Sequence, residues 1–312
     1  MTDVSIIIVS YNTAALTLAA IQSVYDESRL SFELFVVDNA SSDGSADAIA
    51  KRFPLVRLIR LDSNVGFAAA NNLAANEACG RYVLLLNPDT VVLDAAIDTL
   101  VAFADDHPEY GIYGGSTFFP DGSRNPTSGW MRPTAWSLFC VATGLARLFP
   151  SSRVFNPESL AGWSPDAPRE VDVVTGCFLL ASREVWERLG GFDPRFFMYA
   201  EDADLCLRAR KAGLRPVLVP SARIVHYGGA SEPKRADKMV RLFTAKAQLC
   251  RAHYSGLHAR ACVAMLGFWA LARIAMFTAA IPFRRSASAR RREWQEIWRQ
   301  RVLWRAASAV AA

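Results

Sequence analysis

The sequence predicts an α/β fold: a mostly parallel, twisted sheet flanked by helices, followed by a helical extension at the C-terminal end. Two observations carry this prediction. Over residues 1–117, short apolar segments alternate with segments of helical periodicity, which is typical of βαβ units. From about residue 237 onward the pattern is helical throughout. With 312 residues, 52% of them hydrophobic, the chain can form one large core with an appendage, and disorder is not expected.

The first third of the chain contains the expected strands and helices of the parallel sheet. The strands are continuous apolar runs, as in a sheet that is covered on both faces. They lie at residues 4–10, 32–38, 56–61, 81–86 and 110–115. The helices between them lie at residues 13–25, 46–52, 67–78 and 94–104. Because a helix separates successive strands, the sequence predicts parallel pairing.

The rest of the chain is less regular. Residues 118–170 are rich in Pro, Ser and Trp, and we expect a long functional loop there. Four ordered segments follow: a strand pair in 171–182, a helix at 183–191, a helix opened by acidic residues in 199–213, and two short strands at 215–220 and 222–227.

The charge of the chain is unevenly distributed. The formal net charge is +5, but the segment from Arg284 to Arg305 holds eight arginines and two glutamates, so the remainder is near −1. We therefore expect a nearly neutral body with a basic C-terminal segment. A uniformly basic face for nucleic acid is not expected.

The six cysteines and the N-terminus indicate a reducing compartment. The cysteines are scattered, without the close spacing of a zinc site, and we expect small buried side chains rather than disulfides. The first ten residues lack a basic segment and a cleavage site, so we expect a first strand and not a signal peptide. Because export is not expected, the sequon at Asn39 has no glycosylation meaning.

Polar residues follow four of the expected strands, where each strand ends. They are Ser10, Tyr11 and Asn12, then Asp38 and Asn39, then Asn64, and finally Asn87 and Asp89. In open α/β sheets, ligands bind beyond the carboxyl ends of the strands. Neither a G-x-G-x-x-G after the first strand nor a G-x-x-x-x-G-K-[ST] occurs, so no Rossmann or P-loop site is indicated. The simplest alternative for phosphate is a carboxylate that holds a hard cation on a diphosphate.

Each of these residues alone also has a purely structural explanation. An Asp after a strand is often a turn or helix-cap residue, which would explain Asp89. His226 could be a satisfied histidine at a strand end. The acidic cluster at 201–204 could simply begin a helix, because acids are favourable at a helix N-terminus.

Six segments in order give the sequence a family resemblance. They are SIIIVSYN, VVDNASSDGS, NVGFAAANN, LLLNPDT, the long motif from Gly176 to Gly213, and IVHYGGAS, spread over residues 5–231. With them the chain resembles the inverting family 2 glycosyltransferases with the GT-A fold (the nucleotide-diphospho-sugar transferase fold), especially the bacterial rhamnosyltransferase-like branch. The D-x-D signature of the family reads NPD here, which leaves Asp89 as its only carboxylate.

The resemblance implies roles for individual residues. Asp202 matches the catalytic base of the family, and Asp89 would ligate a divalent cation, Mg²⁺ or Mn²⁺, with His226 completing the metal or diphosphate contacts. Asp38 would hydrogen-bond the nucleobase. The other residues expected to line the donor are Ser10, Tyr11, Asn12, Asn64, Gly66 and Asn87. Candidate acceptor or support residues are Glu201, Asp204 and Trp130. Glu201 either raises the pKa of the adjacent base by like-charge repulsion or points elsewhere.

The resemblance also implies a division of labour along the chain. Residues 1–236 would be the GT-A catalytic domain, with a donor-nucleotide half at 1–117 and an acceptor and catalytic-base half at 118–236. Residues 237–312 would be a helical, amphipathic and basic extension. The base would take a proton from the acceptor hydroxyl, typically a 10²–10⁴-fold effect, while the cation offsets the charge of the leaving nucleoside diphosphate. One displacement inverts the anomeric configuration.

The C-terminal segment has the composition of a membrane-associated helix. Residues 261–283 approach the length of a span, about 20 residues, but Arg273 lies at their centre, where an arginine costs about 2.5–3.5 kcal/mol. The arginines that follow are interleaved with Trp294, Trp298 and Trp304, which is typical of a helix lying on an anionic bilayer. The alternative is a set of helices packed on the core with a solvated basic end.

We therefore expect a peripheral enzyme at the cytoplasmic face of the bacterial inner membrane. It would transfer a sugar from a nucleotide-sugar donor, with dTDP-rhamnose as first choice by resemblance, to a lipid-linked or polysaccharide acceptor in cell-envelope glycan synthesis. Residues 136–150 are a candidate second apolar contact for that lipid. Two other classes stay open. A membrane-associated nucleotidyltransferase would need a basic, Gly-rich loop near its start, and an inactive scaffold would not need Asp89, Asp202 and His226 together.

Overall fold

The chain folds into two compact units. The computed structural model describes residues 2–160, 163, 166–228 and 235–306. The sheet unit consists of Met1–Trp130 and Ser164–Ser231, and the helical unit consists of Met131–Trp163 and Glu232–Ala312. The chain thus passes from the sheet unit to the helical unit after Trp130 and again after Ser231. The segment 131–163 is therefore part of the helical unit.

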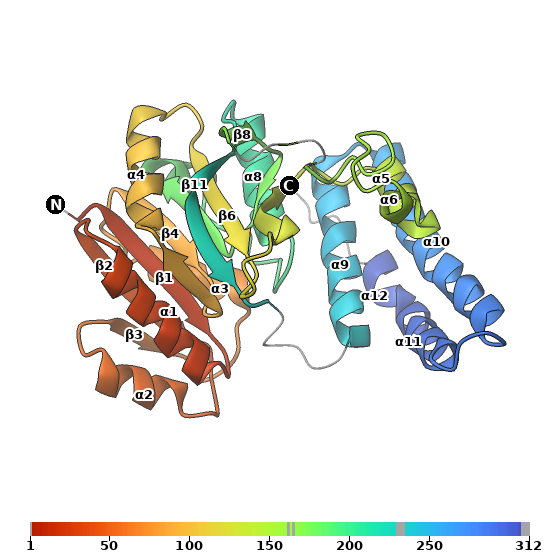
Figure 1. Ribbon diagram of the computed structural model, residues 1–312, viewed down its shortest axis with the longest axis horizontal. Coiled ribbons are helices and arrows are strands. Elements are labelled where there is room, and N and C mark those ends of the chain that lie inside the picture. Colours follow the sequence, from red (N-terminus) through yellow and green to blue (C-terminus); the bar gives the residue numbers. More distant parts are fainter. Residues whose placement is uncertain (1, 161–162, 164–165, 229–234, 307–312) are drawn as a thin grey trace. The chain divides into compact units, whose positions relative to one another are not determined.

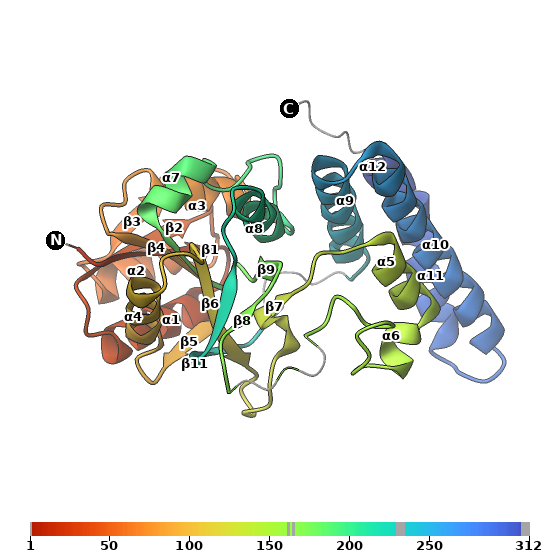
Figure 2. The same cartoon turned by 90° about the horizontal axis from the view of Figure 1, so that it is seen from above.

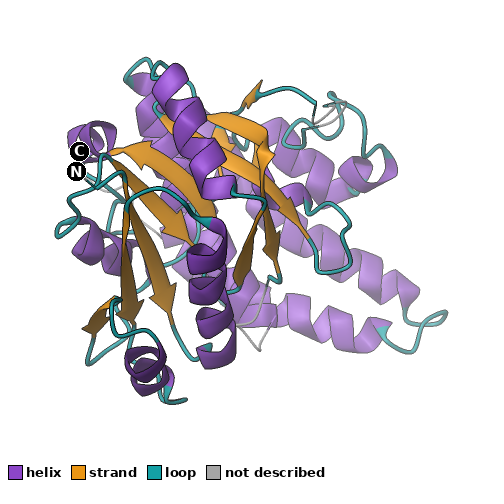
Figure 3. Ribbon diagram, turned by 60° about the vertical axis from the view of Figure 1, so that its left-hand side comes forward, coloured by secondary structure: helices purple, strands orange, loops and turns teal. Residues whose placement is uncertain are grey.

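The sheet unit is built on a mixed sheet (Figures 1 and 3). In the described residues the sheet has nine strands, in the order β3-β2-β1-β4-β10-β6-β11-β5, with β8 pairing to β11 beside this path. The strands are β1 (Val4–Ser10), β2 (Phe32–Asp38), β3 (Arg57–Arg60), β4 (Tyr82–Leu86), β5 (Thr90–Leu93), β6 (Ile112–Phe118), β8 (Arg169–Glu170), β10 (Phe178–Ser182) and β11 (Val217–His226). A separate ribbon pairs β7 (Gly129–Trp130) with β9 (Val173–Val174).

The prediction of parallel pairing is confirmed for β3, β2, β1 and β4, and β6 also runs parallel to β11, whereas β10 and β5 are antiparallel to their neighbours. β3, β2, β1 and β4 are parallel neighbours. β10 is antiparallel to both β4 and β6, because it begins opposite Leu86, at the carboxyl end of β4, and runs back to Tyr82. The described element directly before β10 is the strand β9, and β10 follows it after a short turn.

Two strands at the far side of the sheet differ from the expected elements. β5 directly follows the NPD segment and was not predicted, because four residues give too short a pattern. The two short strands expected at 215–227 are one strand, β11. Its pairing register to β6 shifts between Val219 and Arg223, where Pro220 has no N–H to donate to the ladder.

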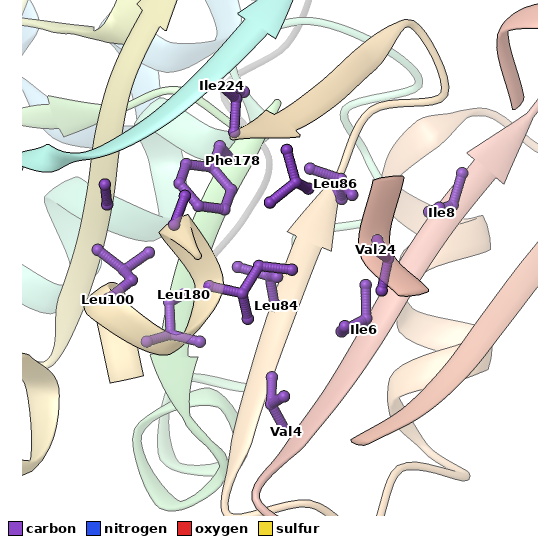
Figure 4. Packing of buried hydrophobic residues seen from close by; sticks show 14 of the residues in the cluster. Val4, Ile6, Ile8, Val24, Leu84, Leu86, Leu100, Phe178, Leu180 and Ile224 are labelled. Atoms are coloured by element: carbon purple, nitrogen blue, oxygen red, sulfur yellow. The ribbon is translucent and has the colours of Figure 1, made fainter. Parts of the chain in front are cut away.

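Helices cover both faces of this sheet, which explains the continuous apolar strands (Figures 1 and 2). One face carries α1 (Ala14–Glu27), α2 (Ser45–Arg52) and α4 (Ala96–Asp106), and the other carries α3 (Phe67–Ala75), α7 (Arg183–Leu189) and α8 (Glu201–Lys211). All seven residues of β1 are buried. On the first face, Ile6, Ile8 and Leu84 pack with Val24 of α1 and Leu100 of α4 (Figure 4). Each such side chain stabilises the fold by about 1.5–3 kcal/mol.

The helical unit has a core of its own. It consists of α5 (Ala135–Thr143), α6 (Leu145–Leu148), α9 (Arg235–His253), α10 (Gly256–Ala280), α11 (Ala287–Arg299) and α12 (Arg301–Ala306). Leu138 of α5 packs in one cluster with Phe243, Leu266 and Trp294. The expectation of a loop throughout 118–170 is therefore wrong for α5. Its N-terminus is a capping box between Thr134 and Ser137, in which Ser replaces the usual Glu or Gln.

The tryptophans of the C-terminal segment do not face outward, which contradicts their expected interfacial role. Trp294 and Trp304 are buried in the core of the helical unit, and Trp298 packs on Trp304 with ring centroids 6.3 Å apart. Among the described residues, α10 is a helix long and apolar enough to cross a membrane, by length and composition only. Only 22% of its most apolar stretch of 18 residues is buried.

The cysteines are mostly as expected. All six are free, and five of them are buried, but Cys79 is exposed. It follows α3 in the short segment that leads to β4, so it does not reach the core.

Candidate active site

The polar residues at the strand ends lie at one edge of the sheet, as predicted. β3, β2, β1 and β4 are adjacent and parallel, so their carboxyl ends are next to each other. Asn12 links the first two ends: its N–H donates to Ser41 Oγ at 3.0 Å, and its Oδ1 accepts from Ser42 N at 2.7 Å. Ser10 is fully buried and its hydroxyl bonds to Thr17, so its side chain belongs to the core.

Asn39 joins the second and third strand ends. Its side-chain amide donates to Asn64 Oδ1 at 3.0 Å, and its Oδ1 accepts from Val65 N at 2.9 Å. Asn64 Oδ1 also accepts from Gly66 N at 2.9 Å. The sequence places Asn39 at a strand end without assigning it a role in the site, but its buried side chain fixes the β3–α3 loop.

One carboxylate oxygen of Asp38 accepts a hydrogen bond within the protein, and the other could accept one from a ligand. Its Oδ2 accepts from Ser41 N at 3.2 Å. Its Oδ1 is buried and has no hydrogen-bond partner among the described residues. Because a buried oxygen without a donor is costly, this atom is suited to accept an N–H from a ligand.

Position 66 requires a glycine because of its backbone conformation and its close packing against a neighbouring segment. Its φ is +87°, and a Cβ at this position would lie 2.4 Å from the carbonyl oxygen of Phe197. That same carbonyl accepts from Phe67 N at 2.8 Å. The close approach at Gly66 is thus to the segment that leads into α8. The contact fixes the start of α8 against the strand ends.

The backbone before α8 is held in a rare conformation. Tyr199 and Ala200 have φ of +72° and +67°, in the left-handed region that residues other than glycine seldom adopt. Such positions cost about 1–3 kcal/mol each and are concentrated at functional sites. They turn the chain directly before Glu201 and Asp202, the first residues of α8.

Asp202 is buried and held by backbone donors. Its Oδ2 accepts from Gly176 N at 2.9 Å, and its Oδ1 accepts from Ala203 N at 2.7 Å. Gly176, in the turn between β9 and β10, is a site residue that sequence reasoning missed. Burial raises the pKa of the Asp202 carboxyl, while these backbone hydrogen bonds act in the opposite direction.

Glu201 is a second buried acid beside this base. Its Oε2 is buried without a hydrogen-bond partner among the described residues. Burial, and then the charge of Asp202, raise the pKa of Glu201 well above its usual range. Two adjacent buried carboxyls of this kind favour a state with fewer than two negative charges.

Asp204 and Trp130, the other two candidate support residues, make contacts that stabilise the fold around the site. Asp204 forms an ion pair with Arg208, with Oδ2 2.7 Å from Nε, and Arg208 also donates to Gly191 O at 2.8 Å. The pair therefore ties α8 to the end of α7. Trp130 lies in β7 and pairs with Val173, three residues before Gly176.

Asp89 and His226 come together at the other side of the strand ends. His226 Nε2 lies 3.3 Å from Asp89 Oδ1, and both side chains are largely buried. Burial lowers the pKa of His226, but the hydrogen bond to Asp89 and the nearby Cys177 thiol raise it, to about 10 in sum. His226 Nδ1 has no hydrogen-bond partner among the described residues.

The register of β5 on β11 produces this pair. His226 is the last residue of β11 and stands opposite Thr90, the first residue of β5. Tyr227 N donates to Asp89 O at 3.0 Å, which extends the pairing by one residue. The neighbouring Asn87 is fixed by its own N–H, which donates to Cys177 O at 3.0 Å.

Asp89 and His226 would fit a divalent cation whose other ligands come from a bound diphosphate. The cation would have to displace the proton of His226, because only the neutral imidazole ligates a metal. Within residues 2–160, 163, 166–228 and 235–306, no three His, Cys, Asp or Glu side chains are grouped to hold a metal ion. A carboxylate and an imidazole side by side are a partial ligand set. Mg²⁺ and similar ions are commonly held by one or two carboxylates, with phosphates and water as the other ligands.

The chain is similar in sequence to known glycosyltransferases. The model of Glycosyl transferase family 2 matches residues 5–163. The N-acetylglucosaminyl-diphospho-decaprenol L-rhamnosyltransferase of Mycobacterium tuberculosis is 32% identical over 206 residues, which are 62% of this chain and 66% of that protein. The O-antigen biosynthesis protein RfbC of Myxococcus xanthus is 32% identical over 215 residues, 66% of this chain but only 16% of that protein.

A solved structure supports the fold. The mannosyltransferase PcManGT from Pyrobaculum calidifontis, in complex with GDP-Man and Mn²⁺, superposes with a TM-score of 0.59 at 21% identity, covering 96% of this chain and 86% of that one. The fold is thus the GT-A fold that the resemblance predicted. The match of the family model over residues 5–163, more than half of the chain, shows that this chain belongs to glycosyl transferase family 2.

Proposed function

We propose that the protein is an inverting, cation-dependent glycosyltransferase that moves a sugar from a nucleoside-diphosphate donor to a hydroxyl of a lipid-linked or polysaccharide acceptor. The observation that carries the proposal is the environment of Asp202: a buried carboxylate held by two backbone N–H groups beside a second buried acid. That arrangement suits a general base.

The strand ends would bind the donor. The unpartnered Oδ1 of Asp38 would accept an N–H of the nucleobase, and Tyr11 and Asn12 would line the nucleoside. Asn64, Gly66 and Asn87 would lie around the ribose and diphosphate. Ser10 would contribute through its backbone only, because its side chain is in the core.

Asp89 and His226 would hold the cation on the donor diphosphate. When bound, Mg²⁺ or Mn²⁺ supplies positive charge that stabilises the departing nucleoside diphosphate. A solved structure with the same fold contains Mn²⁺ together with its nucleotide sugar. For this chain, the convergent carboxylate and imidazole are the support for a similar site.

Asp202 would take the proton of the acceptor hydroxyl as that oxygen attacks the anomeric carbon. The nucleoside diphosphate leaves with the electron pair of the bond that breaks, and a single displacement inverts the anomeric centre. The raised pKa of Asp202 makes it a better proton acceptor once it is ionised. Glu201, whose pKa is raised well above its usual range, would stay protonated beside it and leave Asp202 to carry the negative charge of the pair.

The acceptor side of the proposal is based on the charge of the helical unit. This unit contains 19 Lys and Arg against 5 Asp and Glu, a formal charge of +14, so the sheet unit carries −9 of the total of +5. The expectation of a nearly neutral body therefore changes: the sheet unit is acidic, and the positive excess extends over the whole helical unit. Such a unit favours an anionic membrane surface.

Helix α10 adds an apolar face to this charge. Six exposed apolar residues follow one another at spacings of three or four, which puts them on one side of the helix. They are Leu257, Ala261, Ala264, Phe268, Leu271 and Ala275. We propose that this face lies in the plane of the cytoplasmic leaflet of the bacterial inner membrane, where a lipid-linked acceptor is available.

A transfer assay tests the function. The purified full chain would be screened against nucleotide sugars by thermal shift with Mn²⁺, and the stabilising donor would be incubated with a prenyl-diphosphate-linked sugar. dTDP-rhamnose is the first donor to try, because relatives at 30–32% identity are rhamnosyltransferases by name. Proton NMR of the product reports the anomeric configuration. A protein that neither transfers nor hydrolyses any stabilising donor would be a scaffold, and a product with retained configuration would exclude a single displacement.

A further inference from the structure

The surface formed by α5, α6 and α10 is apolar and exposed. We refer to it as the α5–α10 surface, and its large exposed residues are Trp136, Leu148, Phe149, Phe268, Leu271 and Met276. Aromatic rings continue across it: Phe139 stacks on Trp136 at 5.5 Å and on Phe268 at 5.9 Å between centroids. An exposed apolar patch of this kind marks a contact with another molecule or with lipid.

Two arginines are associated with this surface. Arg273 of α10 is half-buried, and its Nη2 donates to Val141 O, in the last turn of α5, at 3.0 Å. Its Nη1 lies 3.6 Å from the sulfur of the exposed Met276. Arg147 of α6 is exposed and lies next to Leu148 and Phe149.

These two arginines lack acidic partners. Among the described residues neither forms an ion pair with a carboxylate, and α5, α6 and α10 contain no Asp or Glu at all. Burial, and then the positive charge of Arg147, lower the pKa of Arg273. Placing a half-buried guanidinium near a second one is unfavourable in the protein alone, and a bound anion would reverse the sign of that interaction.

The combination of charges and apolar surface restricts the anion. A soluble nucleotide or sugar phosphate would gain nothing from the exposed aromatic rings. A lipid with a diphosphate group would use both features, because its apolar chain can lie on the rings while two guanidinium groups bind its phosphates. Guanidinium groups suit this task, since they donate two parallel hydrogen bonds to phosphate oxygens.

We propose that Arg147 and Arg273 bind the diphosphate of a polyprenyl-diphosphate-linked acceptor, whose prenyl chain lies along the α5–α10 surface. This inference rests on the proposed function, because it names the acceptor class of the same reaction. It assigns a task to Arg273, which as a membrane-span residue would be unfavourable. It also gives a task to residues 136–150, which the sequence indicated as a second apolar contact.

Binding to lipid nanodiscs tests this proposal without requiring activity. The full chain would be titrated with phosphatidylcholine nanodiscs that contain undecaprenyl diphosphate. Two controls are nanodiscs in which phosphatidylglycerol supplies the same total negative charge, and nanodiscs of phosphatidylcholine alone. Arg147→Gln and Arg273→Gln would be compared with Arg260→Gln, an exposed arginine on the same helix. We expect each of the first two changes to weaken binding to the undecaprenyl diphosphate discs by about tenfold. Arg260→Gln should bind these discs like the parent, and binding to phosphatidylglycerol discs should differ far less among the four proteins.

Two results would overturn the proposal. In one, both variants bind the undecaprenyl diphosphate discs as tightly as the parent. In the other, they lose phosphatidylglycerol binding to the same extent, which would make the arginines a general contact for anionic phospholipids. Arg147→Gln alters an exposed side chain, so it remains informative if Arg273→Gln disturbs the contact with α5. Thermal-shift binding of the nucleotide sugar is measured on the same samples. If the parent protein itself bound no nucleotide sugar, the proposed function would be contradicted, but the lipid-binding result could still be interpreted.

Discussion

His226 Nε2 lies 3.3 Å from Asp89 Oδ1, although the two residues are in segments far apart in the chain. The contact results from a strand pairing: Thr90 of β5 stands opposite His226 of β11. Asp89 is thus more than a turn residue at the end of β4, because the four residues after it fix its position against a histidine. A cation site with one carboxylate and one imidazole is the chemistry that this pairing allows.

The first prediction concerns Asp89. We expect Asp89→Ala to weaken Mn²⁺-dependent binding of the nucleoside diphosphate by at least about tenfold, because the bridging cation loses its carboxylate. Calorimetric titration with and without Mn²⁺ measures this. Asp94→Ala is the control, since Asp94 is an exposed carboxylate five residues on that pairs with Arg223. If both variants keep the Mn²⁺ dependence of the parent, Asp89 has only a structural role.

The second prediction concerns Asp202. Replacing it by Asn keeps the shape of the side chain and removes the base, so we expect turnover to fall by at least about 10²-fold while donor affinity changes little. The matched control is Asp204→Asn, two residues further along α8. That change weakens the ion pair with Arg208, so it should lower the free energy of unfolding by about 1–3 kcal/mol with a smaller effect on turnover. Near-normal turnover in Asp202→Asn would remove the base assignment.

The third prediction concerns the pH dependence of stability at Glu201. Its pKa is raised in the folded protein, so the folded state binds the proton more tightly than the unfolded chain. The resulting stability is fully present below the ordinary pKa of Glu, about 4.3, and is lost as the pH rises through the folded pKa. Glu201→Gln removes this loss. We therefore expect the stability of the variant relative to the parent to increase as the pH rises, measured by urea unfolding between pH 4 and 8.

A matched comparison checks the origin of that effect. Glu187→Gln alters an exposed glutamate of α7 and should give a stability difference that is nearly independent of pH. A pH-independent difference for Glu201→Gln as well would mean that Glu201 is not strained by its burial. Because Asp202 contributes to the raised pKa of Glu201, the pH dependence of Asp202→Asn should also be smaller than that of the parent.

The sequence predicts the donor side of the fold well, and the reason is physical. β1 and β2 agree with the expected ranges to the residue, because strands covered on both faces leave continuous apolar runs with polar ends. The same polar ends give Asp38 and Asn64, whose places at one edge follow from parallel order alone. The alternation of strand and helix along the chain is therefore enough to predict most of this half.

What the sequence did not predict depends on long-range pairing. β5 is four residues long and is stabilised by β11, which begins more than a hundred residues later, so no local pattern marks it. Gly176 holds Asp202 only because β10 runs back across the sheet. The burial of Trp294 and Trp304 follows from the packing of α5, α9 and α10 around them. Cutting the chain near Gly256 would expose this core, so point substitutions are the better test of membrane binding.

The last prediction concerns the membrane surface of the helical unit. Arg290 and Arg292 of α11 are exposed and, among the described residues, belong to no ion pair. Replacing both with Gln should weaken binding to anionic liposomes by up to about 2 kcal/mol, because each Arg near the surface adds up to about 1 kcal/mol. The loss should shrink as salt rises, since the Debye length is about 8 Å at physiological ionic strength. The control is the pair Arg52→Gln and Arg60→Gln, which removes the same charge from the sheet unit. Cosedimentation at several salt concentrations measures both. Equal losses in the two double variants would mean that net charge, and not the helical unit, determines the attraction, whereas an unchanged affinity in the α11 variant would shift the contact to the apolar face of α10.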